Sequence, residues 1–598
     1  MVRGPLLDPR RRMICDVVFD LPLHQSFAYA IPSAMTLHPG QRVWARLRGR
    51  PLIGVVIALR DGDEARLHSI ERPVESVPIL SNAALELGRW SAEESLSSLG
   101  STLLALLPPP ARGSRTEVVA PPPEHVAGHA SPPELWVGAG REARLAQQLR
   151  GQSGSALVVA PDRERAARWA ATLDAPRLDS GAPDAARRAA WFAASRGRAR
   201  IVVGTRSAVL TPLPPPATLV LLDEHDPAHK PPGAPRMHAR DLLIRRATLA
   251  GSRLLMLSAT PSVESWWRAD RQRAIRPCLG TEPWPQIITA DTRRILRNHP
   301  ITLPLTRTIE DMTRSGRRMA LIVTRRSAAL ICTECGELFR CPECAVPLYV
   351  SRPQKALACR LCARVEPLPE HCPSCGGHRL FPFGWDAERV EAAVRKRFPK
   401  LSVSRADPRA QVLIGTPAIL RALGPGTLGA VGVVTLDNLL TVPDFRGGER
   451  ALELVWAAAE TVGRGGRVII QTLHPEHYAI QAVQQQDLRT FYEQEIKLRA
   501  ELRYPPFSRL CLISVKSRSQ SEAQARLGDV AQALRGITGL TVYPPAPFGS
   551  VVARSARRQV VIKGPSGLPR LIAPVLRPFL EQRRRGAGVV EVEMDPVS

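Results

Sequence analysis

The sequence predicts a multidomain α/β protein with two parallel α/β lobes, a cysteine-rich insert, a small β-rich N-terminal domain and an α+β C-terminal domain. Three observations lead to this fold class. Short apolar runs alternate with helical patterns through the middle of the chain, eight of the 11 cysteines fall within residues 332–375, and 598 residues suffice for about three or four domains. Hydrophobic residues make up 44% of the chain, so each domain can bury a core.

The first 110 residues are expected to form the β-rich domain. Four short β-prone runs, at residues 15–19, 26–31, 41–47 and 52–59, are separated by Pro, Gly and His. Apolar residues at helical spacing follow and stop at Pro108. Residues 111–133 are rich in Pro, Gly and Ser and have little periodicity, so we expect a linker there.

Two lobes are expected over residues 134–300 and 301–475. Apolar runs too short for helices are separated by helical segments, which is typical of a parallel sheet covered on both faces. These runs lie at residues 156–160, 201–203, 219–222 and 253–257, and then at 319–323, 411–414, 430–436 and 467–471. The cysteine-rich insert, residues 331–377, interrupts the second lobe. Residues 476–598 begin with a charged helix and are expected to form the C-terminal domain.

The charge of the chain predicts a polyanionic partner. Lys and Arg total 82 against 55 for Asp and Glu, a net charge of +27, and basic groups near phosphates gain affinity by releasing counterions. A biased composition explains Arg in place of Lys, but not this excess of basic residues. Aromatic residues are only 5%, which argues against a protein that works mainly by stacking on single-stranded bases. With no signal peptide and no apolar run of membrane-spanning length, we expect a cytoplasmic protein.

The eight clustered cysteines form four C-x-x-C pairs. Two such pairs complete a tetrahedral four-thiolate site, so the pattern predicts two structural zinc ions. Disulfides are disfavoured in a cytosolic chain, and iron–sulfur clusters are a minor alternative. The spacing leaves sequential, interleaved and nested pairings open. Gly follows the outer pairs and Ala follows the inner ones, which favours nesting. The pairs are Cys332 and Cys335, Cys341 and Cys344, Cys359 and Cys362, and Cys372 and Cys375.

Two segments are typical of a nucleic-acid motor. Asp223-Glu224-His225 follows one apolar run, where an acidic element would hold Mg²⁺, and Ser258-Ala259-Thr260 follows a later run. The phosphate loop that should precede them lacks its Gly-Lys-Ser/Thr signature. Gly138 and Gly140 remain at that position, followed by Arg141. The nucleotide pocket is therefore predicted to be inactive, or to bind and hydrolyse nucleotide only very poorly.

From about residue 14 to beyond residue 565, the chain resembles the PriA family, the bacterial primosomal protein N′ that restarts stalled replication forks. The resemblance implies a domain that binds DNA 3′ ends, a winged helix, two RecA-like helicase lobes with a two-zinc insert, and a C-terminal domain. Only the 111–133 linker lies where the winged helix would be, so we expect the winged-helix domain to be missing from this chain. The motifs are the cysteine insert, Gly204-Thr205-Arg206-Ser207-Ala208-Val209, Ser258-Ala259-Thr260-Pro261-Ser262-Val263-Glu264-Ser265, Pro443-Asp444-Phe445-Arg446, Phe491-Tyr492-Glu493 and Tyr504-Pro505-Pro506-Phe507.

The resemblance also implies a nested zinc arrangement. Cys332, Cys335, Cys372 and Cys375 would hold one ion, and Cys341, Cys344, Cys359 and Cys362 the other. The family's Phe-Asp-Tyr element for 3′ ends reads Phe27-Ala28-Tyr29 here, so the aromatic rings can still stack but the carboxylate is missing, which puts end-specific recognition in doubt. Our candidates for DNA contact are Phe27, Tyr29, Arg42, Arg46, Arg48, Arg50, Arg340 and Arg360. A solvated basic edge, or support of the metal ligands, is the alternative for the arginines.

Departures from the family cluster on the ATPase parts. The family's Asp-Glu-Glu-His becomes Leu222-Asp223-Glu224-His225, and the last motif keeps only Gly463-Arg464, with Ala457 and Thr461 where Gln and Arg are expected. The chain thus resembles an ATP-dependent DNA helicase family but is predicted to be catalytically inactive. The remnants of its catalytic motifs are Asp223, Glu224, His225 and Arg464, and Gly138 and Gly140 are what remains of the phosphate loop. ATP is therefore a doubtful cofactor.

The expected function is therefore replication restart without ATP-driven unwinding. The chain would bind stalled or abandoned forks, promote primosome assembly and promote reloading of the replicative helicase. Its expected partners are branched DNA, helicase-loading proteins and the single-stranded DNA-binding protein. Two alternatives stay open: an active ATP-dependent 3′-5′ helicase with unorthodox motifs, and a diverged zinc-containing adaptor in repair.

Overall fold

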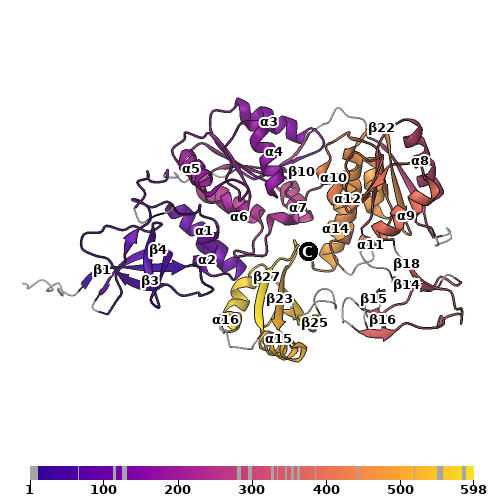
Figure 1. The fold of residues 1–598 in the computed structure, drawn as a ribbon. Coiled ribbons are helices and arrows are strands. Elements are labelled where there is room, and N and C mark those ends of the chain that lie inside the picture. Colours follow the sequence, from indigo (N-terminus) through magenta and orange to yellow (C-terminus); the bar gives the residue numbers. More distant parts are fainter. Residues whose placement is uncertain are drawn as a thin grey trace, which may run out of the picture.

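The computed structural model describes most of the chain between residues 11 and 597. Outside the described part lie residues 1–10, 65, 112, 114–115, 124–130, 279–283, 294–298, 325–328, 333, 344–346, 352–355, 360–363, 384, 441–443, 518, 548–555, 582–587 and 598. Among the described helices, none is both long enough and apolar enough to cross a bilayer. Figure 1 shows the N-terminal sheet at one end, two α/β lobes along the top and the C-terminal sheet beneath the junction between them.

The N-terminal domain is an antiparallel five-stranded sheet in the order β2-β1-β4-β3-β5. Its strands are β1 (Arg11–Phe19), β2 (Phe27–Ala30), β3 (Arg42–Leu47), β4 (Arg50–Asp63) and β5 (Arg72–Pro73). Arg48 and Gly49, with φ of 51° and 79°, make the two-residue turn between β3 and β4, because both central residues of such a tight hairpin take positive φ. Helices α1 (Asn82–Ser95) and α2 (Leu99–Ala105) follow. Gly100 lets α2 approach β1, since a Cβ there would lie 1.8 Å from the Phe19 carbonyl oxygen.

The described part of the expected linker packs on this domain. The Glu117 N–H donates to the Val74 carbonyl at 2.9 Å, and the Ser76 N–H donates to the Glu117 carbonyl at 2.8 Å. Val119 is buried, and Arg188 of the first lobe pairs with Glu117 at 3.3 Å. This segment therefore connects the N-terminal domain to the first lobe through ordered contacts.

The first lobe is a six-stranded parallel sheet in the order β11-β6-β10-β9-β7-β8. Leu157 and Leu219 face one hydrophobic core and Val158 and Val220 the other, as expected for a sheet covered on both faces. Its strands are β6 (Glu134–Val137), β7 (Ser155–Val159), β8 (Ile201–Gly204), β9 (Ala217–Leu221), β10 (Arg253–Ser258) and β11 (Ile275–Pro277). Its helices are α3 (Arg141–Gly151), α4 (Arg163–Leu173), α5 (Asp184–Ser195), α6 (Ala239–Ala250) and α7 (Val263–Arg271), with short 3₁₀ turns η1 (Arg206–Ala208) and η2 (Pro227–His229).

The second lobe is a six-stranded parallel sheet in the order β12-β22-β21-β13-β20-β19. Its strands are β12 (Gln286–Asp291), β13 (Met319–Ile322), β19 (Val403–Ser404), β20 (Val412–Gly415), β21 (Leu428–Val433) and β22 (Val462–Thr472). Its helices are α8 (Leu303–Arg314), α9 (Ala387–Arg397), α10 (Ala418–Ala422), α11 (Asp437–Leu440) and α12 (Gly447–Thr461).

Two boundaries differ from the sequence prediction. Strand β12 pairs in parallel with β22, so the first lobe ends before residue 286 and not at residue 300. Helices α13 (Tyr478–Gln485) and α14 (Leu488–Glu501), expected to open the C-terminal domain, pack instead on α12 and, through α14, on α7. Hydrophobic periodicity predicts an element but not the sheet or helix against which it packs, which explains both differences.

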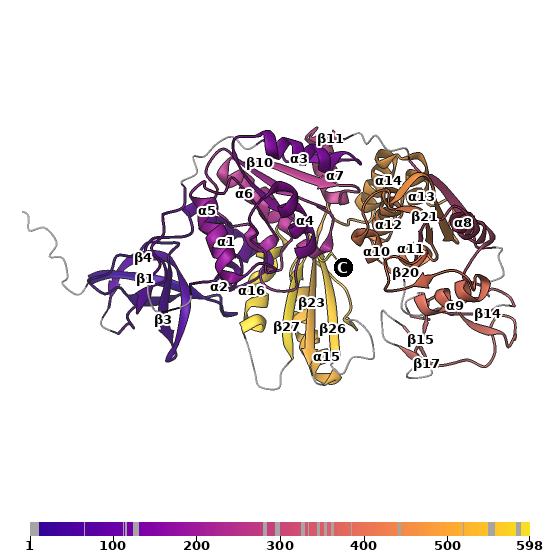
Figure 2. The same ribbon diagram turned by 45° about the horizontal axis from the view of Figure 1, so that its top comes forward.

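The insert and the C-terminal domain are both antiparallel sheets. The insert, at the far end from the N-terminal domain in Figure 2, has the order β17-β16-β15-β14-β18, with β14 (Ala329–Cys332), β15 (Tyr349–Ser351), β16 (Ala356–Ala358), β17 (Val365–Pro367) and β18 (Leu380–Phe383). The C-terminal domain comprises β23 (Arg509–Ser517), α15 (Gln520–Arg535), β24 (Thr541–Val542), β25 (Ala546–Pro547), β26 (Ala556–Gly564), α16 (Leu568–Glu581) and β27 (Val589–Met594). It is joined to the first lobe by Lys230, whose Nζ lies 3.2 Å from the Glu593 carboxylate and 2.6 Å from the Asp595 carbonyl.

Candidate functional site

The segment predicted to be a degenerate phosphate loop joins β6 to α3. Gly138 has a φ of +101°, and a Cβ at this position would lie 2.2 Å from the Cys278 carbonyl oxygen, so only glycine fits. Gly140 is the N-cap of α3, and the N-terminus of a helix favours an anion. The first side chain of this helix already has an anionic partner, since Arg141 donates from Nη1 and Nη2 to the two carboxylate oxygens of Glu460 on α12, at 2.9 and 3.2 Å. Burial disfavours the charged Arg141, but the facing Glu460 raises its pKa above the ordinary value.

The acidic element after β9 is also paired within the protein. Asp223, at a φ of +47°, accepts from Arg165 Nε at 2.9 Å, and Arg165 also pairs with Glu142. Burial alone would raise the pKa of Asp223, but the nearby charges of Arg165, His225 and Arg141 together outweigh burial and lower that pKa. The Asp223 carboxylate is therefore already paired with a guanidinium.

Glu224 and His225 connect the ends of neighbouring strands. The buried Glu224 carboxylate accepts from the Ser262 N–H at 3.0 Å and from the Ser265 hydroxyl at 2.5 Å, and so caps α7. His225 Nδ1 lies 2.6 Å from Ser258 Oγ, which brings the two motor-like segments together. Arg464 lies in β22, and its side chain is outside the described part of the structure.

A buried charge cluster joins the two lobes on the other side of this region. Arg446 donates to both carboxylate oxygens of Glu264 at 2.5 and 3.2 Å, and Arg499 of α14 donates to Glu449 at 2.8 Å. Glu449 also accepts from the Val263 N–H at 2.9 Å. Sequence reasoning missed this cluster and the Arg141–Glu460 pair. Glu264 and Arg446 each lie in a family motif, but nothing in either motif indicates that the two side chains meet.

The structure brings together the outer two C-x-x-C pairs. The four sulfur atoms of Cys332, Cys335, Cys372 and Cys375 lie within 4.8 Å of one another, with Sγ–Sγ distances of 3.7 Å for Cys332–Cys375 and 3.6 Å for Cys335–Cys372. Four sulfurs around a tetrahedral zinc, at about 2.3 Å each, would lie about 3.8 Å apart. The donor set therefore fits a metal ion of this kind.

Both pairs lie on the same kind of turn. The Gly336 N–H donates to the Cys332 carbonyl at 3.0 Å and the Gly376 N–H to the Cys372 carbonyl at 2.9 Å, and both glycines have positive φ. Of the inner pairs, Cys341 and Cys359 are buried, while Cys344 and Cys362 lie outside the described residues.

Two of the DNA-contact candidates are interior residues, and these predictions are wrong. Arg42 is buried, pairs with Glu75 and donates to the Pro108 carbonyl at 2.7 Å, so its guanidinium stabilises the domain. Tyr29 is 2% exposed, and its hydroxyl donates to the Arg46 carbonyl at 2.9 Å, so its ring is unavailable for stacking. In strands this short, the sequence does not show which alternate residues face the core, and a paired arginine can be buried as completely as a leucine.

The other candidates are placed differently. Arg46, Arg48 and Arg50 are exposed at and beside the β3–β4 turn, although Arg46 also pairs with Glu71 at 2.6 Å. Phe27 is half-buried, with its ring centroid 5.9 Å from that of Phe19. Arg340 is exposed on the insert, and Arg360 lies outside the described residues.

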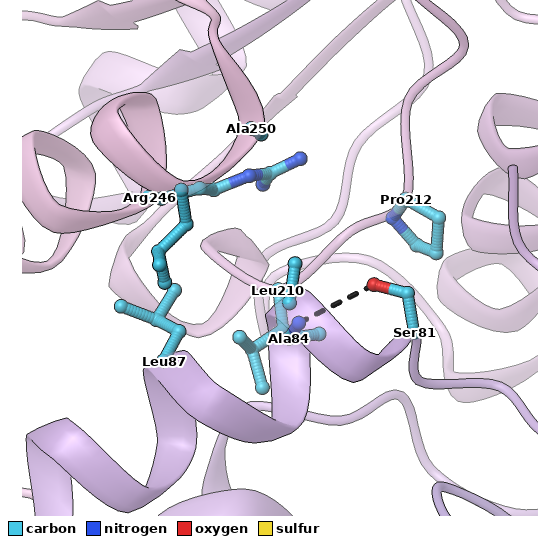
Figure 3. A pocket seen from close by; sticks show the side chains of 9 residues that line it. Ser81, Ala84, Leu87, Leu210, Pro212, Arg246 and Ala250 are labelled. Carbon is cyan, nitrogen blue, oxygen red and sulfur yellow. Dashed lines mark hydrogen bonds between the residues drawn. The ribbon is translucent and has the colours of Figure 1, made fainter. Parts of the chain in front are cut away.

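Two cavities lie at junctions between domains. Figure 3 shows a small cavity between α1 and α6, with Leu87 and Arg246 among the residues that line it. Its volume is about 20 Å³, and Arg246 donates to the Thr211 carbonyl at 2.7 Å. A wider cavity of about 500 Å³ lies where α1, α6, α7 and the C-terminal sheet meet. Charged groups in its lining pair with one another, such as Arg240 with Asp241 at 3.1 Å.

Two family models match the ends of the chain. The 3′ DNA-binding domain of PriA matches residues 16–108, and the primosomal protein N C-terminal domain matches residues 500–597. The second match begins at the end of α14, in line with the packing of α13 and α14 on the lobes.

Curated relatives extend the likeness to the whole chain. The replication restart protein PriA of Treponema pallidum is 29% identical over 98% of this chain and 99% of its own length. The Bacillus subtilis protein of the same name is 29% identical over 68% of this chain, and the match spans only 55% of that relative. A solved structure of RecG bound to a three-way DNA junction aligns at 12% identity and a TM-score of 0.35, over 70% of this chain and 47% of that one. That likeness is too weak to bear on function.

Proposed function

Because the chain belongs to the PriA family of replication restart proteins, we propose that it binds abandoned replication forks in the cytoplasm without unwinding DNA by ATP hydrolysis. In this role it promotes primosome assembly and reloading of the replicative helicase. Support comes from the family-model matches at both ends and from the full-length likeness to the Treponema pallidum relative. The single-stranded DNA-binding protein and helicase-loading proteins are the partners that this role requires.

The observation that carries the proposal is the internal pairing of the nucleotide cleft. Glu460 accepts from Arg141 beside the helix N-terminus that would receive a phosphate, and Arg165 pairs with Asp223 where a magnesium ion would bind. A nucleotide would have to displace both groups. Breaking a buried ion pair costs about 3–5 kcal/mol. That displacement would reduce the nucleotide-binding energy that drives a motor.

DNA binding is proposed to use the exposed arginines at the β3–β4 turn, Arg46, Arg48 and Arg50. They project from a domain that matches the family's 3′ DNA-binding model, and a net charge of +27 favours a phosphate backbone. Arg340 and Arg360, adjacent to cysteines of the insert, are proposed as further phosphate contacts.

The metal of the insert is proposed to be zinc, with two ions per chain. One would be held by Cys332, Cys335, Cys372 and Cys375, and the second by the inner pairs around Cys341 and Cys359. Four thiolates leave no ligand position for water, so the ions would stabilise the fold and take no part in catalysis.

The test is ATP hydrolysis by zinc-replete protein with and without forked DNA, beside fork binding at two salt concentrations. A PriA relative with an intact Gly-Lys-Thr loop serves as the positive control. Salt-sensitive fork binding without stimulated hydrolysis is expected. Fork-stimulated hydrolysis that Asp223→Ala abolishes would overturn the proposal, and so would failure to bind forks.

A further inference from the structure

We propose that the two lobes are locked together by their own side chains, with the Glu460 carboxylate in place of a bound phosphate, while the Arg165 guanidinium within the first lobe stands in place of a bound cation. The lobes then keep one closed arrangement whether or not nucleotide is present. This inference deepens the proposed function and rests on it for its biological meaning. Its test needs no DNA, so the two can fail separately.

The first contact of the lock is the Arg141–Glu460 pair. Both terminal nitrogens of Arg141 meet both oxygens of Glu460, the two-point geometry in which an arginine–carboxylate pair is strongest. The side chains are 8% and 18% exposed, so water screens the attraction only weakly. Arg141 Nη1 also donates to the Gly138 carbonyl at 2.8 Å, which fixes the guanidinium over the glycine loop.

The second contact balances charge within the first lobe. Glu142 and Asp223 would repel each other across the start of the cleft, and the Arg165 guanidinium lies between them. With Arg165 there, the acidic side of the cleft needs no divalent cation. The negative charge that a nucleotide phosphate would bring is already supplied by Glu460, which pairs with Arg141. The positive charge that a metal ion would bring is already supplied by Arg165.

The third contact is the cluster around the N-terminus of α7. Glu224 of the first lobe accepts from the Ser262 N–H and Glu449 of the second lobe accepts from the next N–H, that of Val263, at 2.9 Å. Arg446 and Glu264 add a bidentate pair whose side chains are 12% and 13% exposed. One end of α7 is thus capped from both lobes at once.

Helix α14 extends this contact. Tyr492 stacks on Trp266 of α7 with ring centroids 4.2 Å apart, and its hydroxyl donates to the Pro261 carbonyl at 2.5 Å. Figures 1 and 2 both place α14 and α12 beside α7 at the junction of the lobes. Opening the lobes would break ion pairs on both sides of the cleft and expose this aromatic pair, so the closed form needs no ligand.

The experiment is hydrogen–deuterium exchange on the full-length protein, read at residues 263–271. This segment is α7, which lies on the lobe opposite Glu460, so faster exchange there reports separation of the lobes. The test variant is Glu460→Gln, which keeps the shape and removes the charge. The matched control is Glu476→Gln, an exposed carboxylate that pairs with Arg293 within the second lobe. We expect exchange in α7 to accelerate about tenfold in the test variant, a change of about 1.4 kcal/mol, and to stay unchanged in the control.

A second measurement needs no substitution. Small-angle X-ray scattering of the natural chain is expected to give the same curve with and without millimolar ATP analogue and magnesium. Equal exchange in Glu460→Gln and the control would overturn the lock, and so would compaction of the natural chain by nucleotide. Loss of fork binding would contradict the proposed function and leave the lock standing.

Discussion

Arg141, the first residue of α3, holds both carboxylate oxygens of Glu460, which precedes the last residue of α12 and lies 319 positions later in the chain. The pair joins the two lobes at the point where the chain keeps two glycines of a phosphate loop and lacks its lysine. The basic group beside these glycines, the Arg141 guanidinium, therefore has a carboxylate partner from the other lobe.

Removing the charge of Arg446 is predicted to destabilise the protein strongly. Arg446→Met removes the bidentate partner of the buried Glu264 and leaves Arg499 as the remaining cation beside Glu264 and Glu449, and breaking a buried pair in this way costs about 3–5 kcal/mol. The measurement is the free energy of unfolding from urea titration, followed by tryptophan fluorescence.

Arg489→Met is the matched control for this variant. Arg489 also joins α14 to α7, through Asp270 at 3.4 Å, but the side chains are 59% and 46% exposed. The expected change is within about 0.5 kcal/mol, because water screens such a pair. Equal losses in the two variants would mean that burial does not determine the strength of the contact between the lobes.

Cys332→Ser is predicted to remove one of two zinc ions. The substituted site has three thiolates left, whereas the inner site keeps its ligands. Metal content by mass spectrometry should fall from two to one per chain, and proteolysis within residues 331–377 should accelerate. Cys278→Ser, at a buried cysteine of the first lobe, is the control and should retain both ions. Loss of both ions from Cys332→Ser would show that the two sites form together.

The metal ligands and the contacts between the lobes differ in how far the sequence could predict them. The C-x-x-C spacing is a local property, since each outer pair lies on one turn with a positive-φ glycine, and the structure brings together the four sulfur atoms of the outer pairs that the family resemblance groups in one site. The pairing of β12 with β22 and of Arg141 with Glu460 depends on which distant segments meet. Neither periodicity nor residue type encodes that choice. The buried Arg42 illustrates the same limit, because its partner Glu75 lies 33 residues away.

Substitution of Arg48 by Ala is predicted to weaken fork binding through charge alone. If the side chain contacts one phosphate, affinity falls for all fork sequences and the slope of log K against log salt decreases by about 0.9. Fluorescence anisotropy at several salt concentrations measures both quantities. Arg409→Ala, at an exposed arginine of the second lobe, is the control, with an unchanged slope. An unchanged slope for Arg48→Ala as well would remove the β3–β4 turn from the DNA interface.

Glu453 is predicted to make the stability of the protein depend on pH around neutrality. The carboxyl of this α12 residue interacts electrostatically with His225 of the first lobe, and burial raises its pKa to about 7 against the attraction of His225. The folded chain therefore binds more protons than the unfolded chain between the ordinary glutamate pKa of about 4.3 and about 7. Its free energy of unfolding must fall as the pH rises through that window.

Glu453→Gln removes the titrating group while preserving its shape and is expected to abolish this part of the pH dependence. Urea titrations at intervals from pH 5 to 9 should show that the natural chain loses stability toward pH 7 relative to Glu453→Gln, and that the difference between the two is constant above pH 8. The neighbouring charges of Glu449, Arg446 and Arg450 remain in both proteins, so the comparison isolates Glu453. Parallel curves over the whole range would mean that Glu453 titrates normally and that the cleft between the lobes is open to water at this position.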